Sequence, residues 1–314
     1  MKIDKEKIYI IHTIKENKIL SLNYGYNIDA FNNYDHKIIE LLKKEISTTL
    51  KINDLTYVVE CIKHKPIIYI FGGGNVALAL SNICKICNFY VVVFDQRKEL
   101  AHKNRFINAD EVICDNFINI FKTYKFKNNA YYVIATNTQQ NDQKCLQEII
   151  QKSYQYIGML GSKQKSSMIL SNLEKNNYPK EQLNKIHTPI GLSINAQSPE
   201  EIAISILAQI IQIKNNENIQ ECYLDFFEYV KPPCILCTII STASSCPRKI
   251  GCKMIVYKDG SIYNTIGGGN LEVAVINKAK KLFTNDNTYT FLDYIDANQP
   301  STKIQVLLEK ITFD

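Results

Sequence analysis

Apolar and polar residues along this chain follow two different periods, and the change between them predicts where strands and helices lie. Between residues 66 and 214, strands are predicted at the mainly apolar runs 67–71, 89–94, 111–114, 130–135 and 156–160. Helical spacing of the apolar residues is found at 76–87, 143–153, 163–176 and 199–214. Continuous strands that alternate with helices predict a parallel sheet with helices on both faces.

The segment before this region is only weakly patterned. Residues 7–14 and 55–62 have the composition and alternation of strands, and residues 35–49 have the spacing of an amphipathic helix. We therefore treat residues 1–64 as a small N-terminal module, whose fold the pattern does not define.

The segment after this region begins with a polar stretch and then becomes apolar again. Residues 215–233 are a candidate linker, and residues 234–314 are predicted to form a second, smaller α+β domain. Strands are expected at 235–241 and 253–257, with a hairpin turn at Asp259-Gly260. A helix is expected at 271–283, directly after three glycines, whereas the last thirty residues show no clear pattern.

A glycine-rich turn follows the first strand of the central region. The string F-G-G-G-N-V-A at 71–77 fits a strand, a G-x-G-x-x-A turn and a helix. Gly72 allows a tight turn, Gly74 lets the backbone approach a ligand phosphate, and Ala77 lets the helix pack closely on the sheet. The start of the helix offers N–H groups and a partial positive charge to an anion.

An acidic residue lies where this kind of turn needs one. Asp95 ends the next predicted strand, 21 residues after Gly74, which is the place of a ribose-binding carboxylate. The pair predicts a nucleotide- or pterin-binding, Rossmann-like, doubly wound domain at 66–214. Arg97 could meet a phosphate or stack on a ring, or it could be a surface residue that holds the loop.

Composition and charge narrow the function. The formal net charge is +6, and the basic residues are mostly scattered lysines rather than the clustered basic face of a nucleic-acid-binding protein. We expect no secretory signal, no membrane span and a cytoplasmic location, in which the ten cysteines are reduced. The two C-x-x-C pairs, at 84–87 and 234–237, lie far apart and are expected to pack in cores rather than bind zinc.

At this point the residues resemble a known family, the xanthine dehydrogenase accessory factors, or XdhC/CoxI family. The turn at 71–77 resembles its F-G-A-G-H-V-A segment, and F-D-Q-R at 94–97 its D-x-R strand end. Y-I-G-M-L-G-S-K at 156–163 is similar to its Y-I-G-M-I-G-S-R/K segment. H-T-P-I-G-L at 187–192, followed by S-P-E-E-I-A at 198–203, resembles a further run of the same family.

The second domain resembles the same family. S-S-C-P-R-K-I-G-C-K-M at 244–254 is similar to G-S-S-P-R-x-x-G-A-K-M, and I-G-G-G-N-L-E at 266–272 to I-G-G-G-x-L-E. In many members this domain comes first, so the domain order here is reversed. The chain also departs from the family: T-N-T-Q-Q-N-D at 136–142 lacks the two histidines of T-H-x-H-x-x-D, Asn75 replaces a histidine, and the usual C-G-G segment is not visible in 291–314.

The resemblance implies a maturation factor rather than an enzyme. Such a protein binds the molybdenum–pterin cofactor and helps to insert its sulfurated form into a molybdenum hydroxylase such as xanthine dehydrogenase. It implies a cysteine desulfurase as a second candidate partner and a homodimer as a candidate assembly, without nucleic acid or membrane. We find no Ser–His–Asp order, carboxylate pair or metal triad that would make a catalytic site.

The candidate cofactor-binding residues combine the glycine turns with polar residues of the matching segments. They are Gly72, Gly73, Gly74, Asn75, Asp95, Arg97, Gly161, Ser162, His187, Ser245, Cys246, Arg248, Lys253, Gly267, Gly268 and Gly269. Some have structural alternatives: His187 could shape its loop, Arg248 could form a structural ion pair, Cys246 could be a plain small residue, and the second glycine turn could be structural. Lys163 and Lys165 could add positive charge near Ser162.

Two other functions remain open on the sequence alone. The glycine turn and Asp95 would also suit an NAD(P)-dependent oxidoreductase, for which His187 or a tyrosine would have to supply the proton donor. The missing histidines and cysteines would instead suit a non-catalytic scaffold that binds the target enzyme without cofactor.

Overall fold

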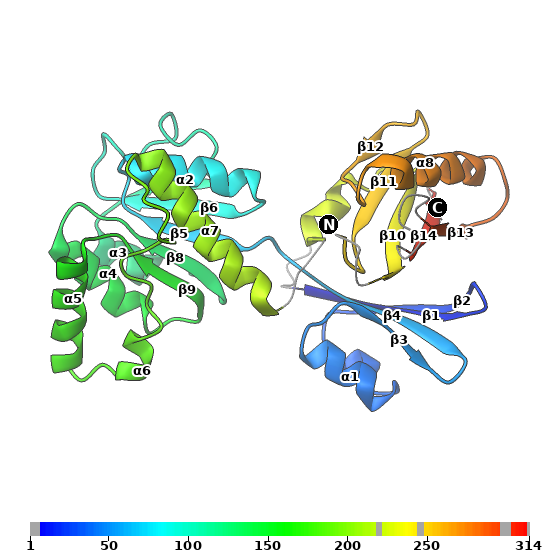
Figure 1. Cartoon of the computed structure of the whole chain (residues 1–314), viewed down its shortest axis with the longest axis horizontal. Helices are drawn as coiled ribbons and strands as arrows, with labels where there is room; N and C mark the ends of the chain where they lie inside the picture. The colour runs from blue at the N-terminus through cyan, green and yellow to red at the C-terminus, as the bar shows by residue number, and fades with distance from the viewer. Residues whose placement is uncertain (1–6, 218–221, 244–247, 296–302, 313–314) are drawn as a thin grey trace. The chain divides into compact units, whose positions relative to one another are not determined.

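The computed structural model describes residues 7–217, 222–243, 248–295 and 303–312. The chain divides into two compact units (Figure 1). The Rossmann unit is Lys65–Glu217. The other, which we call the two-sheet unit, combines both ends of the chain, Met1–His64 and Asn218–Asp314. Along the sequence, the Rossmann unit is therefore inserted between the two halves of the two-sheet unit.

The Rossmann unit is built on a parallel five-stranded sheet in the order β7-β6-β5-β8-β9. Its strands are β5 (Ile67–Phe71), β6 (Tyr90–Asp95), β7 (Glu111–Cys114), β8 (Ala130–Ile134) and β9 (Tyr154–Met159). The direction of winding reverses at β5, the first strand of the unit. Ligands of such sheets bind beyond the carboxyl ends of the strands at this reversal, and the glycine turn lies there. The predicted fold class is confirmed.

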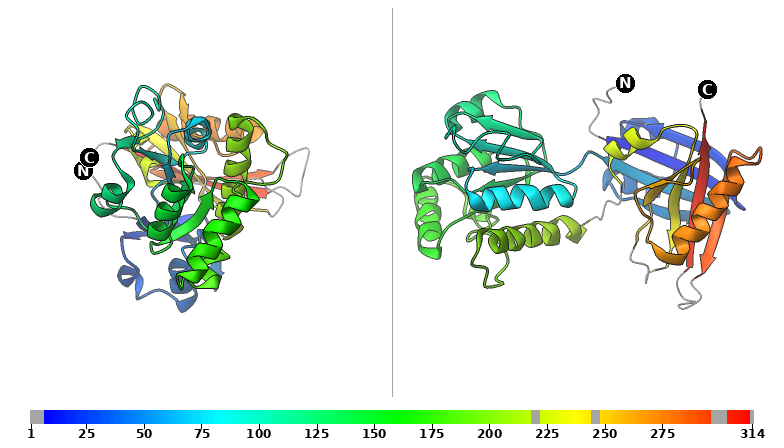
Figure 2. Two further views of the ribbon diagram at one scale, coloured as in Figure 1. Left: turned by 90° about the vertical axis from the view of Figure 1, so that its left-hand side faces the viewer. Right: turned by 90° about the horizontal axis from the view of Figure 1, so that it is seen from above.

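Helices cover both faces of this sheet (Figures 1 and 2). They are α2 (Asn75–Ile86), α3 (Phe117–Thr123), α4 (Gln139–Ile149), α5 (Lys163–Lys175), α6 (Lys180–Leu183) and α7 (Pro199–Glu217). Ile68 and Ile70 of β5 pack with α2 and α7, whereas Tyr69 and Phe71 pack with α3, α4 and α5. Both faces of the strand are buried, which explains its unbroken apolar sequence.

Helix α4 begins earlier than the apolar pattern predicts, because its first turn is polar. The pattern predicts it at 143–153, but it begins at Gln139, where the side chain of Thr138 accepts a hydrogen bond from the Asn141 N–H. Its first four residues are all polar, so the cap rather than the apolar spacing marks its start. Within the ranges that the structure describes, no helix is long and apolar enough to cross a membrane.

The N-terminal segment forms an antiparallel sheet in the order β2-β1-β4-β3. Its elements are β1 (Lys7–Lys15), β2 (Lys18–Gly25), η1 (Ile28–Phe31), α1 (His36–Lys43), β3 (Thr48–Ile52) and β4 (Leu55–Lys63). The predicted helix at 35–49 is too long. Helix α1 ends at Lys43, Glu45 has a positive φ of 56°, and β3 follows directly.

The C-terminal segment forms a second antiparallel sheet in the order β12-β11-β10-β14-β13. Its elements are η2 (Leu224–Tyr229), β10 (Cys234–Thr242), β11 (Lys253–Tyr257), β12 (Ile262–Tyr263), α8 (Gly269–Phe283), β13 (Tyr289–Ile295) and β14 (Lys303–Ile311). Helix α8 packs on the outer face through Leu271, Val275 and Ala279. The unpatterned end of the chain thus supplies β14, which is a central strand of this sheet.

The two sheets of this unit pack face to face. Apolar contact is made by Ile14 and Val58 on one side and by Ile240 and Leu307 on the other. A buried ion pair crosses the same interface: Lys253 Nζ lies 2.8 Å from Glu60 Oε1, and the two side chains are 2% and 1% exposed. Burial opposes a charged lysine, but the attraction of Glu60 raises the pKa of Lys253 above its ordinary value.

Breaking this ion pair is expected to destabilise the two-sheet unit. Lys253→Ala leaves the Glu60 carboxylate buried without a counter-charge, which costs about 3–5 kcal/mol in the free energy of unfolding. Lys15→Ala is the matched control, because Lys15 pairs with Asp54 at 3.9 Å on the surface and contributes about 0–1 kcal/mol. Urea unfolding followed by circular dichroism measures both. Equal effects of the two substitutions would contradict this account.

Candidate functional site

The glycine turn between β5 and α2 is shaped by a close approach of the neighbouring strand. Gly72 has a φ of +119°, and its N–H donates to the Phe94 carbonyl at 2.7 Å. A Cβ at this position would lie 2.1 Å from the carbonyl oxygen of Ala135, just after β8. Glycine is therefore required at 72 both by the backbone conformation and by space.

Asp95 holds the middle of this turn. Its Oδ2 accepts from the Gly73 N–H at 2.6 Å and from Arg97 Nη2 at 2.7 Å, and its Oδ1 accepts from the backbone N–H and Nε of Arg97, both at 2.9 Å. Burial on its own would raise the pKa of Asp95, but these donors hold that pKa below its ordinary value. The structure thus brings together three residues that the sequence singled out separately.

Gly74 is the open position of the turn. It is the N-cap of α2, with φ −69° and ψ −177°, and no side chain caps the helix there. Apart from its chain neighbours, no described heavy atom lies within 4 Å of where a Cβ would be. Backbone N–H groups at the start of a helix lack partners within the helix, so this is the point where an anion can reach them.

Arg105 adds a positive charge that the sequence patterns did not indicate. Its Nη2 donates to Asn75 Oδ1 at 2.9 Å and its Nε to the Gly73 carbonyl at 3.3 Å, so the guanidinium is fixed beside the turn. No spacing rule places a residue of the long β6–β7 connection there. A signal did exist: the chain contains only three arginines, at 97, 105 and 248, and each lies beside a glycine turn.

Gly161 and Ser162 lie at the same edge of the sheet, after β9. Ser162 is the N-cap of α5, where its hydroxyl accepts from the Lys165 N–H at 3.2 Å. The ammonium of Lys165 forms an ion pair with Asp142, a fully buried carboxylate that also accepts from the Thr136 N–H at 3.1 Å. The charge of Lys165 is thus already neutralised within the unit.

His187 lies in a short segment that extends the sheet beside β9, where it bridges to Gly158. Its ring stacks on Tyr156 with centroids 4.9 Å apart and planes 11° from parallel. Burial lowers the pKa of His187, which favours the neutral imidazole at pH 7. The structure shows how this histidine is held, and its contact with a ligand stays a prediction.

The second glycine turn, before α8, is filled by a side chain of its own helix. Glu272 Oε1 accepts from the Gly268 N–H at 3.0 Å, from the Ile266 N–H at 3.1 Å and from the Thr265 hydroxyl. These donors outweigh the effect of burial and hold the pKa of Glu272 below its ordinary value. A ligand phosphate at Gly267, Gly268 and Gly269 would therefore have to displace Glu272.

The remaining candidates belong to the two-sheet unit. The Cγ atom of Arg248 lies 3.5 Å from where a Cβ of Gly267 would be, so its aliphatic stem runs beside the second glycine turn. Lys253 is buried, and its Nζ bonds Thr238 Oγ1 at 2.9 Å as well as pairing with Glu60. Ser245 and Cys246 lie outside the described residues.

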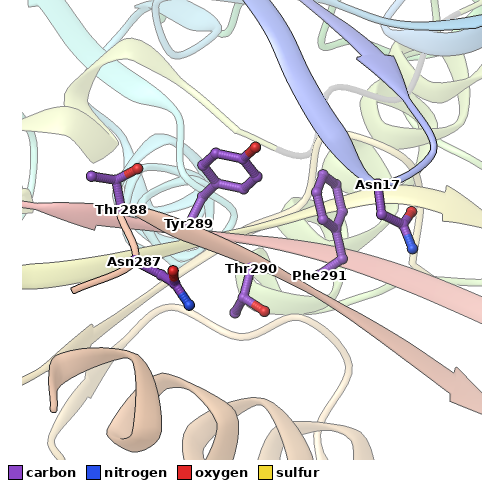
Figure 3. A pocket seen from close by; sticks show the side chains of 6 residues that line it. All are labelled: Asn17, Asn287, Thr288, Tyr289, Thr290 and Phe291. Carbon is purple, nitrogen blue, oxygen red and sulfur yellow. The ribbon is translucent and has the colours of Figure 1, made fainter. Parts of the chain in front are cut away.

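Two further features of the described residues, the arrangement of possible metal ligands and one surface pocket, add nothing to this picture. Among the residues that the structure describes, no group of three or more His, Cys, Asp or Glu side chains is placed to hold a metal ion. A shallow pocket of ≈ 410 Å³ lies between the β1–β2 hairpin and β13. Tyr289 and Phe291 project from one side of β13 toward the hairpin that carries Asn17 (Figure 3). Its lining contains none of the candidate residues.

The two ends of the first glycine turn are expected to respond differently to an added methyl group. Gly72→Ala forces a Cβ into the Ala135 carbonyl and is expected to lower the free energy of unfolding by at least about 2 kcal/mol. Gly74→Ala meets open space at an ordinary φ and should change it by less than about 1 kcal/mol. Urea unfolding of both variants checks this, and similar losses at the two positions would show that the turn is not built as described.

The hydrogen bonds that Asp95 accepts from Gly73 and Arg97 should make the stability of the protein depend on pH. Since the folded-state pKa lies below the unfolded value of about 3.9, ionised Asp95 stabilises the fold at higher pH, and this stabilisation is lost as pH falls through the folded pKa. The difference in unfolding free energy between the wild type and Asp95→Asn should be constant from about pH 5 to 7 and shrink below about pH 4. A difference that persists unchanged to about pH 2.5 would refute it.

Comparison with known proteins identifies most of the Rossmann unit and part of the two-sheet unit. A family model described as the XdhC Rossmann domain matches residues 68–210, and one described as the XdhC and CoxI family matches residues 231–294. The protein YqeB of Escherichia coli (strain K12), described as uncharacterized, is 29% identical over 153 residues, which is 48% of this chain and 28% of that protein. A protein of Bacillus subtilis (strain 168) described as a probable xanthine dehydrogenase subunit is 31% identical over 156 residues, which is 50% of this chain and 45% of that protein.

Among solved structures, a crystal structure of a xanthine dehydrogenase from Bacillus halodurans is 28% identical, with a TM-score of 0.56. The match covers 67% of this chain and 62% of that one. The chain thus spans less than half the length of the two curated relatives and under two thirds of this structure. The two domain models, the relatives and the shared fold agree, and the chain belongs to the XdhC and CoxI family.

Proposed function

We propose that this chain binds the molybdenum–pterin cofactor by its phosphate and helps to insert the sulfurated cofactor into a molybdenum hydroxylase of the xanthine dehydrogenase type. The observation that carries the proposal is the open turn at Gly74, beside which Arg105 is held by Asn75. The relatives named after xanthine dehydrogenase support the class of client enzyme.

The contrast between the two glycine turns favours the first as the phosphate site. At the start of α8, the Glu272 carboxylate already occupies the backbone N–H groups. The first turn of α2 carries no acidic side chain, and Gly74 has no capping partner. An anion from outside the chain can therefore take at Gly74 the place that Glu272 takes at Gly268.

The arginines support the same assignment. Lysines outnumber arginines many times over in this chain, so charge or solubility alone does not explain where the arginines lie. A guanidinium offers planar, paired donors that match a phosphate, which an ammonium does not. Arg97 and Arg105 both contact the turn that contains Gly73, one through Asp95 and one through the Gly73 carbonyl.

In the proposed complex, the residues of this chain bind and orient rather than catalyse. Backbone N–H groups at the start of α2 receive the phosphate oxygens, and Arg105 balances their charge. When bound, the cofactor supplies the molybdenum and sulfur chemistry that the client enzyme uses. In this proposal a cysteine desulfurase provides the sulfur and the client enzyme is the acceptor.

The test is retention of cofactor by the purified full chain. The chain is mixed with molybdenum cofactor released from a molybdenum hydroxylase, separated by gel filtration, and its molybdenum content is measured. Gly74→Val should lower retention at least about tenfold, because its side chain fills the space over the helix N-terminus. Arg105→Ala should lower it about three- to tenfold.

Two matched variants separate an effect on the phosphate site at Gly74 from general effects on the protein. Gly74→Ala places a smaller side chain at the same position, and its cofactor retention should lie between those of the wild type and Gly74→Val. Lys98→Ala removes a positive charge from the same exposed loop and should retain cofactor normally. Equal retention by all variants would contradict phosphate binding at Gly74. Hydride transfer from NADH would favour an oxidoreductase instead.

A further inference from the structure

Asp95, which lies where a ribose-binding acid is expected, already has hydrogen-bond donors at all of its acceptor positions. A carboxylate has about four lone-pair positions for donors. Asp95 receives four hydrogen bonds, one from the Gly73 N–H and three from Arg97, at 2.6 to 2.9 Å. Its side chain is 2% exposed. Asp95 thus stands at the position of a ribose-binding acid but has no acceptor position left for a ribose hydroxyl.

Displacing Arg97 would be costly for a neutral ligand. The pair is a bidentate fork between opposite charges, which is among the strongest side-chain contacts in proteins. A ribose diol offers two neutral donors in exchange, and the guanidinium would lose a buried partner. Arg97 therefore prevents a sugar hydroxyl from donating a hydrogen bond to Asp95.

Arg97 also presents charge outward. The fork to Asp95 uses two of the five guanidinium N–H groups, and 29% of the side chain is exposed. Where a dinucleotide-binding turn would offer acceptors to a diol, this turn offers a cation. The local chemistry is suited to an anion on both sides of Gly73, with Arg105 on the other side.

The geometry points to a site that recognises a phosphate monoester by the phosphate itself and leaves the ribose of a nucleotide unread, with Arg97 as the residue that sets this specificity. This inference rests on the proposed function, because it names the part of the ligand that the same turn reads. It predicts that a nucleoside attached to the phosphate adds nothing through its sugar hydroxyls.

The wild-type chain tests this directly by calorimetric titration with AMP, 2′,3′-dideoxy-AMP, inorganic phosphate and adenosine. AMP and its dideoxy form should bind with dissociation constants within about twofold of each other, inorganic phosphate should compete with both, and adenosine should not bind. AMP binding about tenfold or more tightly than dideoxy-AMP would overturn the inference while leaving the phosphate cradle standing. Binding of neither nucleotide nor phosphate would overturn the proposed function as well.

A substitution supplies the converse experiment. Arg97→Ala removes the Nε and Nη2 donors and so frees one acceptor position on each oxygen of Asp95. It should create a preference for AMP over dideoxy-AMP of about tenfold, which is the effect of one hydrogen bond to a charged group. Lys98→Ala is the matched control, since it removes the adjacent charge without touching Asp95, and it should show no preference. A folded Arg97→Ala variant that still does not distinguish the two ligands would refute the role of Arg97. If that variant does not fold, the wild-type comparison decides alone.

Discussion

The glycine turn of the Rossmann unit is organised around one buried negative charge. A carboxylate that is almost fully withdrawn from water has to be surrounded by donors, and for Asp95 these are a backbone N–H of the glycine turn and the guanidinium of Arg97. The same contacts tie Gly73 and the first residues after β6 to one carboxylate. The open amide groups at Gly74 are consequently held in place by a residue that does not itself face the ligand.

The two glycine turns of the chain differ in what accepts hydrogen bonds from the backbone N–H groups at the start of the following helix. Both precede a helix, whose first backbone N–H groups have no acceptor within the helix. The turn before α8 is completed internally by Glu272, which makes it a stable structural corner. The turn before α2 has no such residue, so its positive end remains available. Similar sequence motifs can therefore have different uses, and the residue four positions beyond Gly268 makes the difference.

Much of the architecture could be predicted from the sequence, because its signals are local. The central strands β5, β6 and β8 are buried on both faces and read as nearly unbroken apolar runs, and the glycine turn marks the change from strand to helix. The proximity of Asp95 to the turn also follows from its place at a strand end. Which donors fill Asp95, and the approach of Arg105 to Asn75, depend on how a loop folds back, and no periodicity records that.

The fold of the N-terminal segment could be predicted only in part, for a different reason. Its inner face includes Glu60 and His12, which look like surface residues in sequence but lie 1% and 4% exposed. They are buried because Lys253 and Glu309, almost two hundred residues or more further along the chain, supply their partners. Each sheet thus depends on polar residues of the other, and the local pattern of either segment does not show this dependence.

This arrangement has a consequence for biosynthesis. The first sheet leaves the ribosome long before the strands that complete its inner face, and the whole Rossmann unit is made in between. Because domains of a growing chain fold from the N-terminal end as they emerge, the Rossmann unit can fold while the first sheet still presents Glu60 and its apolar neighbours uncovered. The inner face of the first sheet is covered only once β11 and β14, which carry Lys253 and Leu307, have been made.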